Sequence, residues 1–353
     1  MAAPRVGTAL AGRSPRRALP TAGACVRRSM VICPCHRPPP PGSPQESACR
    51  RGPRAPLAPR PLPARNQPPP AEPSGQGGRA TVAEAIRVVV FGAHPDDDDI
   101  KAGGTAALWS DRGDDVLFVS LTNGDAGHQG LAGGELARRR RAEAEAAARE
   151  LGGVRYRVLD NHDGALTPSL DLRTQIIAII REHQADVVLL PRPWDYHPDH
   201  RATAQVVQDA AYMVTVPNVA AFAPHLRRNP VFAYVADHFT RPCPFRPDVV
   251  LDTTPVIERK LRALHRHTSQ VYEWLPYNAG TLAEVPADEA ARLVWLRRWL
   301  EGDQRQAHER RDALARWYGA PRAAAAQYAE AFEICELGRR PEEAELRRLF
   351  PLG

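Results

Sequence analysis

The chain has 353 residues, which is enough for one large or two moderate domains with a substantial hydrophobic core. Its formal net charge is +6, but residues 1–81 contain 13 Arg, no Lys and two acidic residues, a net of +11, so the remaining 34 basic and 39 acidic residues carry −5. The predicted globular part is therefore mildly acidic and lacks the electrostatic basis for nucleic-acid binding.

Residues 1–81 are predicted to be a disordered leader. They hold 18 of the 35 prolines and four of the six cysteines, and such a segment cannot bury enough apolar surface to offset the entropy of ordering. Its Arg-rich, acid-poor composition is compatible with an organelle transit peptide and also with a misassigned translation start. The Cys-Pro-Cys-His stretch at 33–36 is interpreted as incidental. Cys243 and Cys335, the two remaining thiols, favour a reducing compartment, so a cytoplasmic location is expected unless the leader directs import.

Beyond the leader, apolar runs alternate with helix-forming segments, and no run of about 18 apolar residues predicts a transmembrane segment. Strands are predicted over 86–91, 115–122, 155–159 and 186–190, and helices over 102–111, 135–151, 172–183 and 202–213. This order predicts a Rossmann-like α/β fold, with a mostly parallel sheet covered by helices on both sides. Residues 82–285 are expected to form this domain.

Residues 286–353 are predicted to be a helical extension that packs on the domain. Leu293, Leu296 and Leu300, with two nearby Trp residues, have the spacing of an amphipathic helix, and Tyr328 with Phe332 predicts another. Aromatic residues at this spacing usually belong to a core, so the extension is assigned an architectural role.

The first cluster of titratable side chains follows the first predicted strand, where His94 precedes four aspartates at 96–99. Repulsion among four carboxylates is tolerable if the cluster is solvated or if a cation neutralises it. One interpretation is a solvated acidic turn or helix start, since Asp near a helix N-terminus is favoured by the helix dipole. The adjoining imidazole on a rigid strand end favours a transition metal such as Zn²⁺, because Ca²⁺ prefers oxygen ligands alone.

A second cluster follows the fourth predicted strand, where His197 and His200 flank a Pro-Asp pair in one tight turn. Like the first cluster, it lies after an apolar strand and before a helix, so both clusters are expected at the same edge of the sheet, where ligands bind. One His and one Asp from the first cluster with a His from the second would leave a position for water, which is the open coordination of catalytic zinc.

The two clusters together resemble the paired signature of the LmbE/PIG-L family of zinc-dependent N-deacetylases. The resemblance extends from about residue 88 to 270, and its further matching positions are 122–127, Arg140 with Glu143, 163–164, and Lys260 through 267–270. It implies that His94, Asp97 and His200 bind Zn²⁺, the expected cofactor. It also implies that Asp96 is the general base and that His197 is the acid or oxyanion-stabilising partner.

The same resemblance places Asp125 and Arg140 near the substrate. Where this chain has Asp99, the family usually has Glu, whose side chain is longer. The resemblance implies a supporting role for this position. Asp199 is predicted either to orient His197 by accepting its other N–H or to cap the helix that follows.

The sequence therefore predicts a zinc-dependent hydrolase that uses metal-activated water to remove an N-acetyl group from an amino-sugar-containing small molecule or glycoconjugate. An alternative is a metal-binding module that has lost turnover and serves in interaction or regulation, although the retained Asp96 and His197 argue against it. A nucleotide-binding oxidoreductase is disfavoured because no Gly-x-Gly-x-x-Gly turn follows the first strand. No nucleic-acid partner is expected, and a homo-oligomer is compatible with the sequence.

Overall fold

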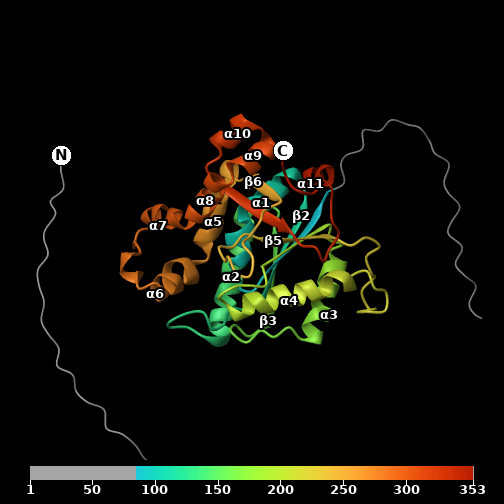
Figure 1. Cartoon of the computed structure of the whole chain (residues 1–353). Coiled ribbons are helices and arrows are strands. Elements are labelled where there is room, and N and C mark those ends of the chain that lie inside the picture. Colours follow the sequence, from blue (N-terminus) through green and yellow to red (C-terminus); the bar gives the residue numbers. More distant parts are fainter. Residues whose placement is uncertain (1–84, 353) are drawn as a thin grey trace, which may run out of the picture. The chain divides into compact units, whose positions relative to one another are not determined.

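The computed structural model describes residues 85–352 (Figure 1). The predicted leader, including its Cys-Pro-Cys-His stretch, lies outside the described residues. The first half of the described chain contains β1 (Arg87–Gly92), α1 (Asp97–Arg112), β2 (Asp115–Thr122), α2 (Gly133–Leu151), β3 (Arg155–Asn161), α3 (Leu170–Glu182), β4 (Val187–Leu190) and α4 (Pro198–Met213). These elements confirm the predicted alternation of strands and helices.

The second half of the chain completes the sheet and adds several short helices. Its elements are β5 (Val231–Val235), β6 (Val249–Asp252), α5 (Ile257–Arg266), a π-helical turn at Ser269–Trp274, α6 (Leu275–Asn278), α7 (Glu289–Leu296), α8 (Glu301–Glu309), α9 (Arg311–Tyr318), α10 (Ala320–Ala325), β7 (Ala329–Ile334) and α11 (Glu343–Leu349). Within residues 85–352, no helix is both long and apolar enough to span a membrane.

The seven strands form one sheet in the order β3-β2-β1-β4-β5-β7-β6. Strands β1 to β5 are parallel, with Val89 opposite both Leu117 and Val188, whereas β7 runs antiparallel to β5 and to β6. The sheet is thus mixed but mostly parallel, as predicted. Its β7 strand corrects one expectation: Phe332 lies in an interior strand and Tyr328 just before it, so the predicted helix over these residues is wrong.

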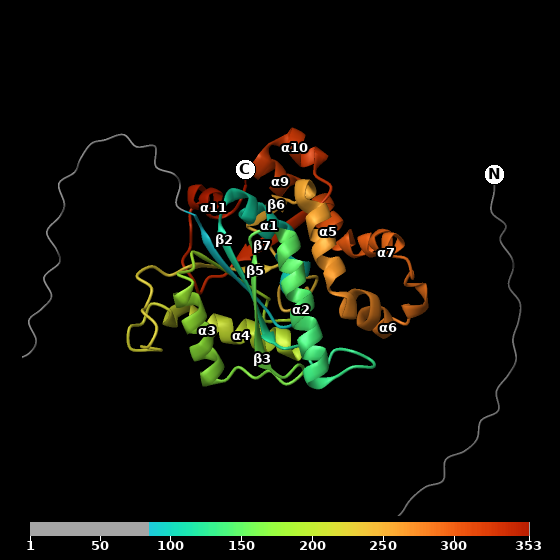
Figure 2. The same cartoon turned by 180° about the vertical axis from the view of Figure 1, so that it is seen from behind.

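Two layers of helices cover the two faces of the sheet (Figure 2). In β1, Val88 and Val90 pack with Trp109 of α1 and with α2 and α5, whereas Val89 and Phe91 pack on the opposite side with α3 and α4. Successive side chains of a strand point to opposite faces, so an unbroken apolar run is what a strand buried on both faces requires. The edge formed by the carboxyl ends of the strands is therefore supported by a hydrophobic core on each face of the sheet.

Helices α1 and α4 begin five and four residues earlier than the sequence predicted, at Asp97 and Pro198. Both titratable clusters therefore lie at the starts of helices, where the helix dipole favours carboxylates. The acidic cluster is not a solvated turn, because Asp98 and Asp99 are 1% and 0% exposed. Gly92 permits this close packing, since a Cβ there would lie 2.7 Å from Asp98 Oδ1 and 2.8 Å from Asp97 Cβ.

Candidate metal centre

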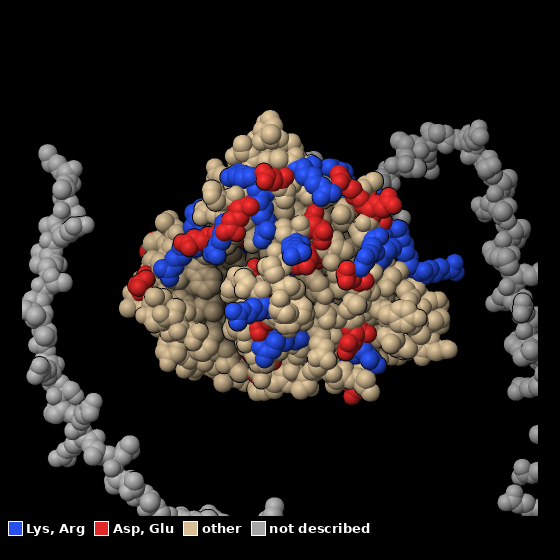
Figure 3. All heavy atoms as spheres, viewed as in Figure 1, with Lys and Arg blue, Asp and Glu red and all other residues tan. Residues whose placement is uncertain are grey.

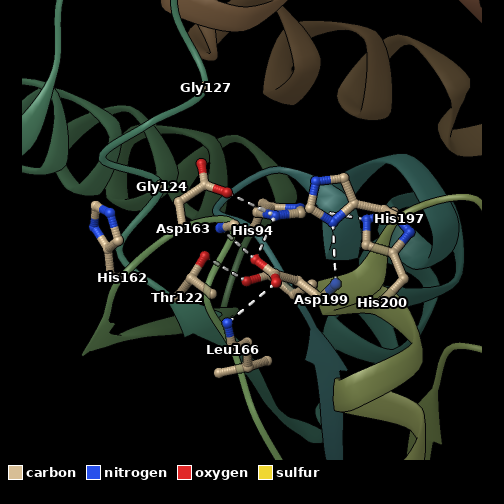
Figure 4. Close-up of polar contacts among 12 residues, drawn as sticks. His94, Thr122, Gly124, Gly127, His162, Asp163, Leu166, His197, Asp199 and His200 are labelled. Carbon is tan, nitrogen blue, oxygen red and sulfur yellow. Dashed lines mark hydrogen bonds and ion pairs between the residues drawn. The ribbon is translucent and has the colours of Figure 1, made fainter. Parts of the chain in front are cut away.

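Three imidazoles from the two distant clusters face one another at the carboxyl edge of the sheet (Figure 4). His94 comes from the turn between β1 and α1, His197 is the N-cap residue of α4, and His200 lies in the first turn of that helix. The ring centroids of His94 are 4.5 Å from those of His197 and 5.2 Å from those of His200. The predicted convergence of two segments about 100 residues apart is therefore present in the structure.

The side chains of His94, Asp97 and His200 bring one ligand atom each to a common point. His94 Nδ1 lies 3.5 Å from Asp97 Oδ2 and 3.3 Å from His200 Nε2, and His200 Nε2 lies 3.4 Å from Asp97 Oδ2. Atoms bonded at about 2.0–2.2 Å to a tetrahedral zinc are themselves roughly 3.3–3.5 Å apart. The donor set and its spacing thus fit a tetrahedral metal with one position left over.

Two other groups of candidate ligand atoms overlap this triangle. His94 with His197 and His200, and His94 with Asp163 and Asp199, each have ligand atoms within 4.8 Å of one another among the described residues. We favour the triangle with Asp97 because its sides are nearly equal. In the second group, the carboxylates of Asp163 and Asp199 face Nε2 of His94, the ring nitrogen that is not part of the triangle, and are better explained as groups that orient the ring.

In both imidazoles of the triangle, the ring nitrogen that is not part of the triangle faces a carboxylate. His94 Nε2 lies 3.1 Å from Asp163 Oδ1 and 3.4 Å from Asp199 Oδ2, within ion-pair distance although not aligned as a hydrogen bond. His200 Nδ1 lies 3.0 Å from Asp195 Oδ1. Such outer partners fix the tautomer and orientation of histidine ligands.

The environment of the triangle strongly favours cations. Burial lowers the pKa of His94, but the carboxylates of Asp163, Asp199 and Asp97 outweigh it and raise that pKa well above its usual value. Burial raises the pKa of Asp97, but His200 and His94 outweigh it and the net shift is downward. Asp97 Oδ2 also accepts the backbone N–H groups of residues 93 and 94, both at 2.9 Å, so the carboxylate is fixed and ionised.

Comparison with known proteins identifies the family to which these residues belong. Residues 89–211 match the family described as PIG-L, GlcNAc-PI de-N-acetylase. The diacetylchitobiose deacetylase of Thermococcus kodakarensis is 33% identical over 207 residues, which cover 54% of this chain and 74% of that protein. This chain belongs to the PIG-L family.

Among the other similar proteins, one has a different named activity and one has a solved structure. The 4-oxalmesaconate hydratase of Pseudomonas putida is 27% identical over 204 residues, which cover 55% of this chain and 78% of that enzyme. The solved structure of N,N'-diacetylchitobiose deacetylase from Pyrococcus horikoshii has a TM-score of 0.56 and 27% identity, and covers 72% of this chain and 85% of that one. The PIG-L match contains both histidine clusters and ends before β5.

In this PIG-L chain, Asp96 and Arg140 form a buried pair beside the triangle. Arg140 Nη2 donates to Asp96 Oδ1 at 3.1 Å, and Arg140 Nη1 donates to the carbonyl oxygen of Gly124 at 3.3 Å. Of the four arginines at 138–141, Arg140 is the buried one, with 2% exposure. Burial raises the pKa of Asp96, and the Arg140 charge opposes that shift. Gly124, at φ +70°, lets the guanidinium approach the chain closely.

His197 and Asp199 are not arranged as the sequence predicted. The backbone N–H of Asp199 donates to His197 Nδ1 at 3.2 Å, so His197 caps α4. The Asp199 carboxylate instead accepts the N–H groups of Gly164 at 2.7 Å and Leu166 at 3.2 Å, on the His94 side of the site. Both expected contacts of Asp199 are therefore wrong, because the helix begins at Pro198 and its first turn directs this side chain away from His197.

The protonation of His197 follows from its surroundings. Burial and the nearby charges of His94 and His200 lower its pKa, so the neutral ring is favoured near neutral pH. Since Nδ1 accepts a backbone hydrogen bond, the proton of the neutral ring is on Nε2. His197 is thus equipped to donate one hydrogen bond from Nε2.

The remaining expected residues support the site from outside the triangle. Asp99 Oδ2 lies 2.9 Å from Nε2 of the fully buried His267, which ties α1 to the end of α5. Asp125 Oδ1 accepts the backbone N–H of Asp163 at 3.0 Å, and its other oxygen lies 2.7 Å from His162 Nδ1. Asp99 and Asp125 therefore contact the elements that carry the site.

The sequence did not predict the contacts of two carboxylates at the site. Asp163 was given only as a position that matches the family and Asp195 was given no role, yet both face imidazoles of the triangle. The signal for Asp163 was its place after the third strand, on the same edge as the clusters. The signal for Asp195 was its spacing of five residues from His200 in one turn.

Proposed function

We propose that this protein is a zinc-dependent N-deacetylase that hydrolyses the N-acetyl group of an amino-sugar-containing substrate. The observation that carries the proposal is the triangle of His94, Asp97 and His200, with sides of 3.3–3.5 Å, beside a buried carboxylate that is not part of it. The named activity of the Thermococcus relative and membership in a family described as de-N-acetylases support the reaction class.

In this proposal His94, Asp97 and His200 hold Zn²⁺. When bound, the metal supplies a Lewis acid and lowers the pKa of water near it toward neutrality. Asp163 faces Nε2 of His94 and Asp195 faces Nδ1 of His200, and these carboxylates favour the tautomers that leave the nitrogens of the triangle free to bind the metal. Asp96 and His197 lie beside the three residues of the triangle and would be the groups available to a water held there.

The chemical steps fall to Asp96 and His197. Asp96 accepts a proton from the attacking water as its oxygen bonds to the acetyl carbonyl carbon, and Arg140 fixes the carboxylate for this transfer. His197 donates a hydrogen bond to the carbonyl oxygen, on which negative charge develops. When the carbon–nitrogen bond breaks, the proton held by Asp96 passes to the amine, and acetate leaves.

Two other functions are distinguished from this proposal by the measurements described below. One similar protein is named 4-oxalmesaconate hydratase, so a second candidate function is hydration, in which Asp96 would serve as the base for the attacking water. The predicted alternative, a metal-binding module without turnover, would retain the triangle and release no product. Cytoplasmic location and homo-oligomer formation stay predictions.

The proposal is tested by measuring acetate release from a panel of N-acetylated sugars and glycoconjugates. Wild-type protein loaded with zinc is expected to release acetate from at least one member, to lose this activity on treatment with a chelator and to regain it on adding zinc. Metal analysis should give one zinc per chain. Bound zinc with no acetate release, together with hydration of an unsaturated dicarboxylate, would favour the hydratase.

The role assigned to Asp195 gives a separate prediction about zinc affinity. Asp195→Asn keeps the size of the side chain but weakens its hold on His200 Nδ1, so zinc affinity is expected to fall by about 10–100-fold. Competition with a chromophoric chelator measures this affinity without any substrate. Asp160→Asn, also near the carboxyl edge but bonded to Asn123, is the matched control and should bind zinc as the wild type does. Equal affinities in both variants would contradict the role of Asp195.

A further inference from the structure

The backbone of Gly127 lies where three polar side chains from different elements meet. A Cβ built on this glycine would be 3.2 Å from Arg140 Nη1, 3.2 Å from Asp163 Oδ2 and 3.8 Å from Trp274 Nε1. Figure 4 shows Gly127 on the segment between β2 and α2, which passes Asp163. Because glycine has no side chain, no atom of its own fills the space between these groups.

These polar groups adjoin the proposed reaction centre. Asp163 Oδ1 lies 3.1 Å from Nε2 of His94, a proposed metal ligand. Arg140 Nη2 donates to Oδ1 of Asp96, the proposed base, at 3.1 Å. The space beside Gly127 is thus separated from the ligand and from the base by one side chain each.

Two of the polar atoms beside Gly127 have no hydrogen-bond partner in the protein. Within residues 85–352, Trp274 Nε1 donates no hydrogen bond and Asp163 Oδ2 accepts none, and neither is among the buried polar atoms that lack a partner. By contrast, Nε1 of Trp295 is buried without a partner. The Trp274 and Asp163 atoms are therefore reached by solvent and available to a ligand.

A hydroxyl group matches this pair of atoms. An indole N–H is only a donor and an ionised carboxylate only an acceptor, whereas a hydroxyl group both accepts and donates. One hydroxyl beside Gly127 can therefore accept from Trp274 and donate to Asp163. A carbonyl oxygen would satisfy only the donor, and an ammonium group only the acceptor, so the pair favours an alcohol.

The indole is held in place by contacts between two segments. Trp274 is the last residue of the π-helical turn at Ser269–Trp274, and such turns are frequent at functional sites. Within this turn, Gln270 Nε2 donates to the carbonyl oxygen of Gly127 at 3.1 Å. Glu273 Oε2 lies 2.8 Å from Nε2 of His128, in the same segment as the glycine. The turn is thus tied at two points to the segment that faces the indole N–H.

The surface around Trp274 suits a neutral ligand. Tyr277 of α6 stacks on the indole with ring centroids 6.1 Å apart, so it covers one face and leaves the N–H edge for recognition. Residues 275–283 contain no Asp, Glu, Lys or Arg, and few charged side chains are visible over α6 (Figure 3). A hydroxyl-bearing ring approaches this surface without breaking ion pairs.

We infer that Trp274 is a specificity-determining residue, whose indole N–H donates to a hydroxyl oxygen on the N-acetylated sugar ring. The inference rests on the proposed N-deacetylase function and adds a residue that selects hydroxylated rings over N-acetylated amines without hydroxyl groups. Trp274 lies outside residues 89–211, so this selectivity comes from a segment that the PIG-L match does not contain.

Two tryptophan variants test this assignment on two substrates. Phe keeps a flat apolar ring but lacks the N–H, and Trp295→Phe is the control for Trp274→Phe because Nε1 of Trp295 is buried. On N-acetylglucosamine, Trp274→Phe is expected to lower kcat/KM about fivefold, the size of one neutral hydrogen bond. On N-cyclohexylacetamide, which has a ring and the amide but no hydroxyl group, the loss should be less than about twofold. Trp295→Phe should change neither value by more than about twofold.

An NMR titration separates this inference from the proposed function. Zinc-loaded Asp96→Asn is labelled with ¹⁵N in its indoles, and the Trp274 signal is the one that disappears when Trp274→Phe is added. N-acetylglucosamine is expected to shift this signal and to leave the Trp295 signal in place. If no acetate is released from any sugar, the proposed function fails, and the titration alone decides the role of Trp274. An unmoved Trp274 signal, an unchanged kcat/KM for N-acetylglucosamine in Trp274→Phe, or equal losses on both substrates would overturn the inference.

Discussion

Asp96→Asn is expected to lower the rate of acetate release by about 10²–10⁴-fold while leaving one zinc bound per chain. The amide has nearly the same shape as the carboxylate but cannot take a proton from the attacking water. Because Asp96 lies beside the triangle of His94, Asp97 and His200 and contributes no atom to it, the metal should be retained. The measurements are acetate release under saturating substrate and zinc content by elemental analysis.

Two controls make this result specific. Asp111→Asn changes the same functional group in the same helix, but Asp111 is on the surface and pairs with Arg259, so activity should stay within about twofold of wild type. The Tm of Asp96→Asn shows whether weakening the hydrogen bond between Arg140 and residue 96 destabilises the fold. Loss of zinc from Asp96→Asn would mean that base and ligand have been interchanged, and full activity would exclude Asp96 as the base.

The first four strands and both titratable clusters could be predicted because their signals are local in the sequence. The unbroken apolar run of β1 demands burial on both faces, and the helices that follow it show their own periodicity. Once β1 and β4 are assigned as parallel strands, the turns after them must lie at one edge. The approach of His94 to His200 follows from this topology alone.

The side-chain contacts within the site could not be predicted, since they depend on where each helix begins. A shift of about four residues at α4 makes His197 the N-cap and directs Asp199 toward residues 164–166. The same dependence explains why Asp195 was missed: its contact with His200 arises from the fold of one turn. Spacing identifies the residues of a turn but not the directions of their side chains.

The position of β7 was unpredictable for a different reason. The segment enters the sheet between β5 and β6, about 95 residues after β5, and pairs with both in the antiparallel direction. Nothing in the local pattern of Tyr328 and Phe332 distinguishes a strand from an amphipathic helix, because short apolar segments fit both. Only the pairing of β7 with two partners decides its conformation, and this pairing brings Glu330 to Lys260.

Lys260→Met is expected to lower the free energy of unfolding by about 3–5 kcal/mol, which corresponds to a fall in Tm on the order of 10 °C. Lys260 is 1% exposed and neutralises the buried Glu330 and the mostly buried Asp303. Removing the ammonium group leaves these carboxylates uncompensated. Lys101→Met alters the chain's only other lysine, which is partly exposed and makes one backbone hydrogen bond, and it should cost no more than about 1 kcal/mol.

The destabilisation by Lys260→Met should also depend on pH. Burial raises the pKa of Asp303 to about 6, against the opposing charge of Lys260. A carboxyl group with a raised pKa binds its proton more tightly in the folded state, so its contribution to stability is present at low pH and is lost as pH rises through that pKa. Without Lys260 the largest charge that opposes this loss is gone, so the variant should be closer to wild type at pH 5 than at pH 8. Urea denaturation at both pH values measures the difference, and a cost independent of pH would mean that lost packing, rather than unpaired charge, accounts for the effect of Lys260→Met.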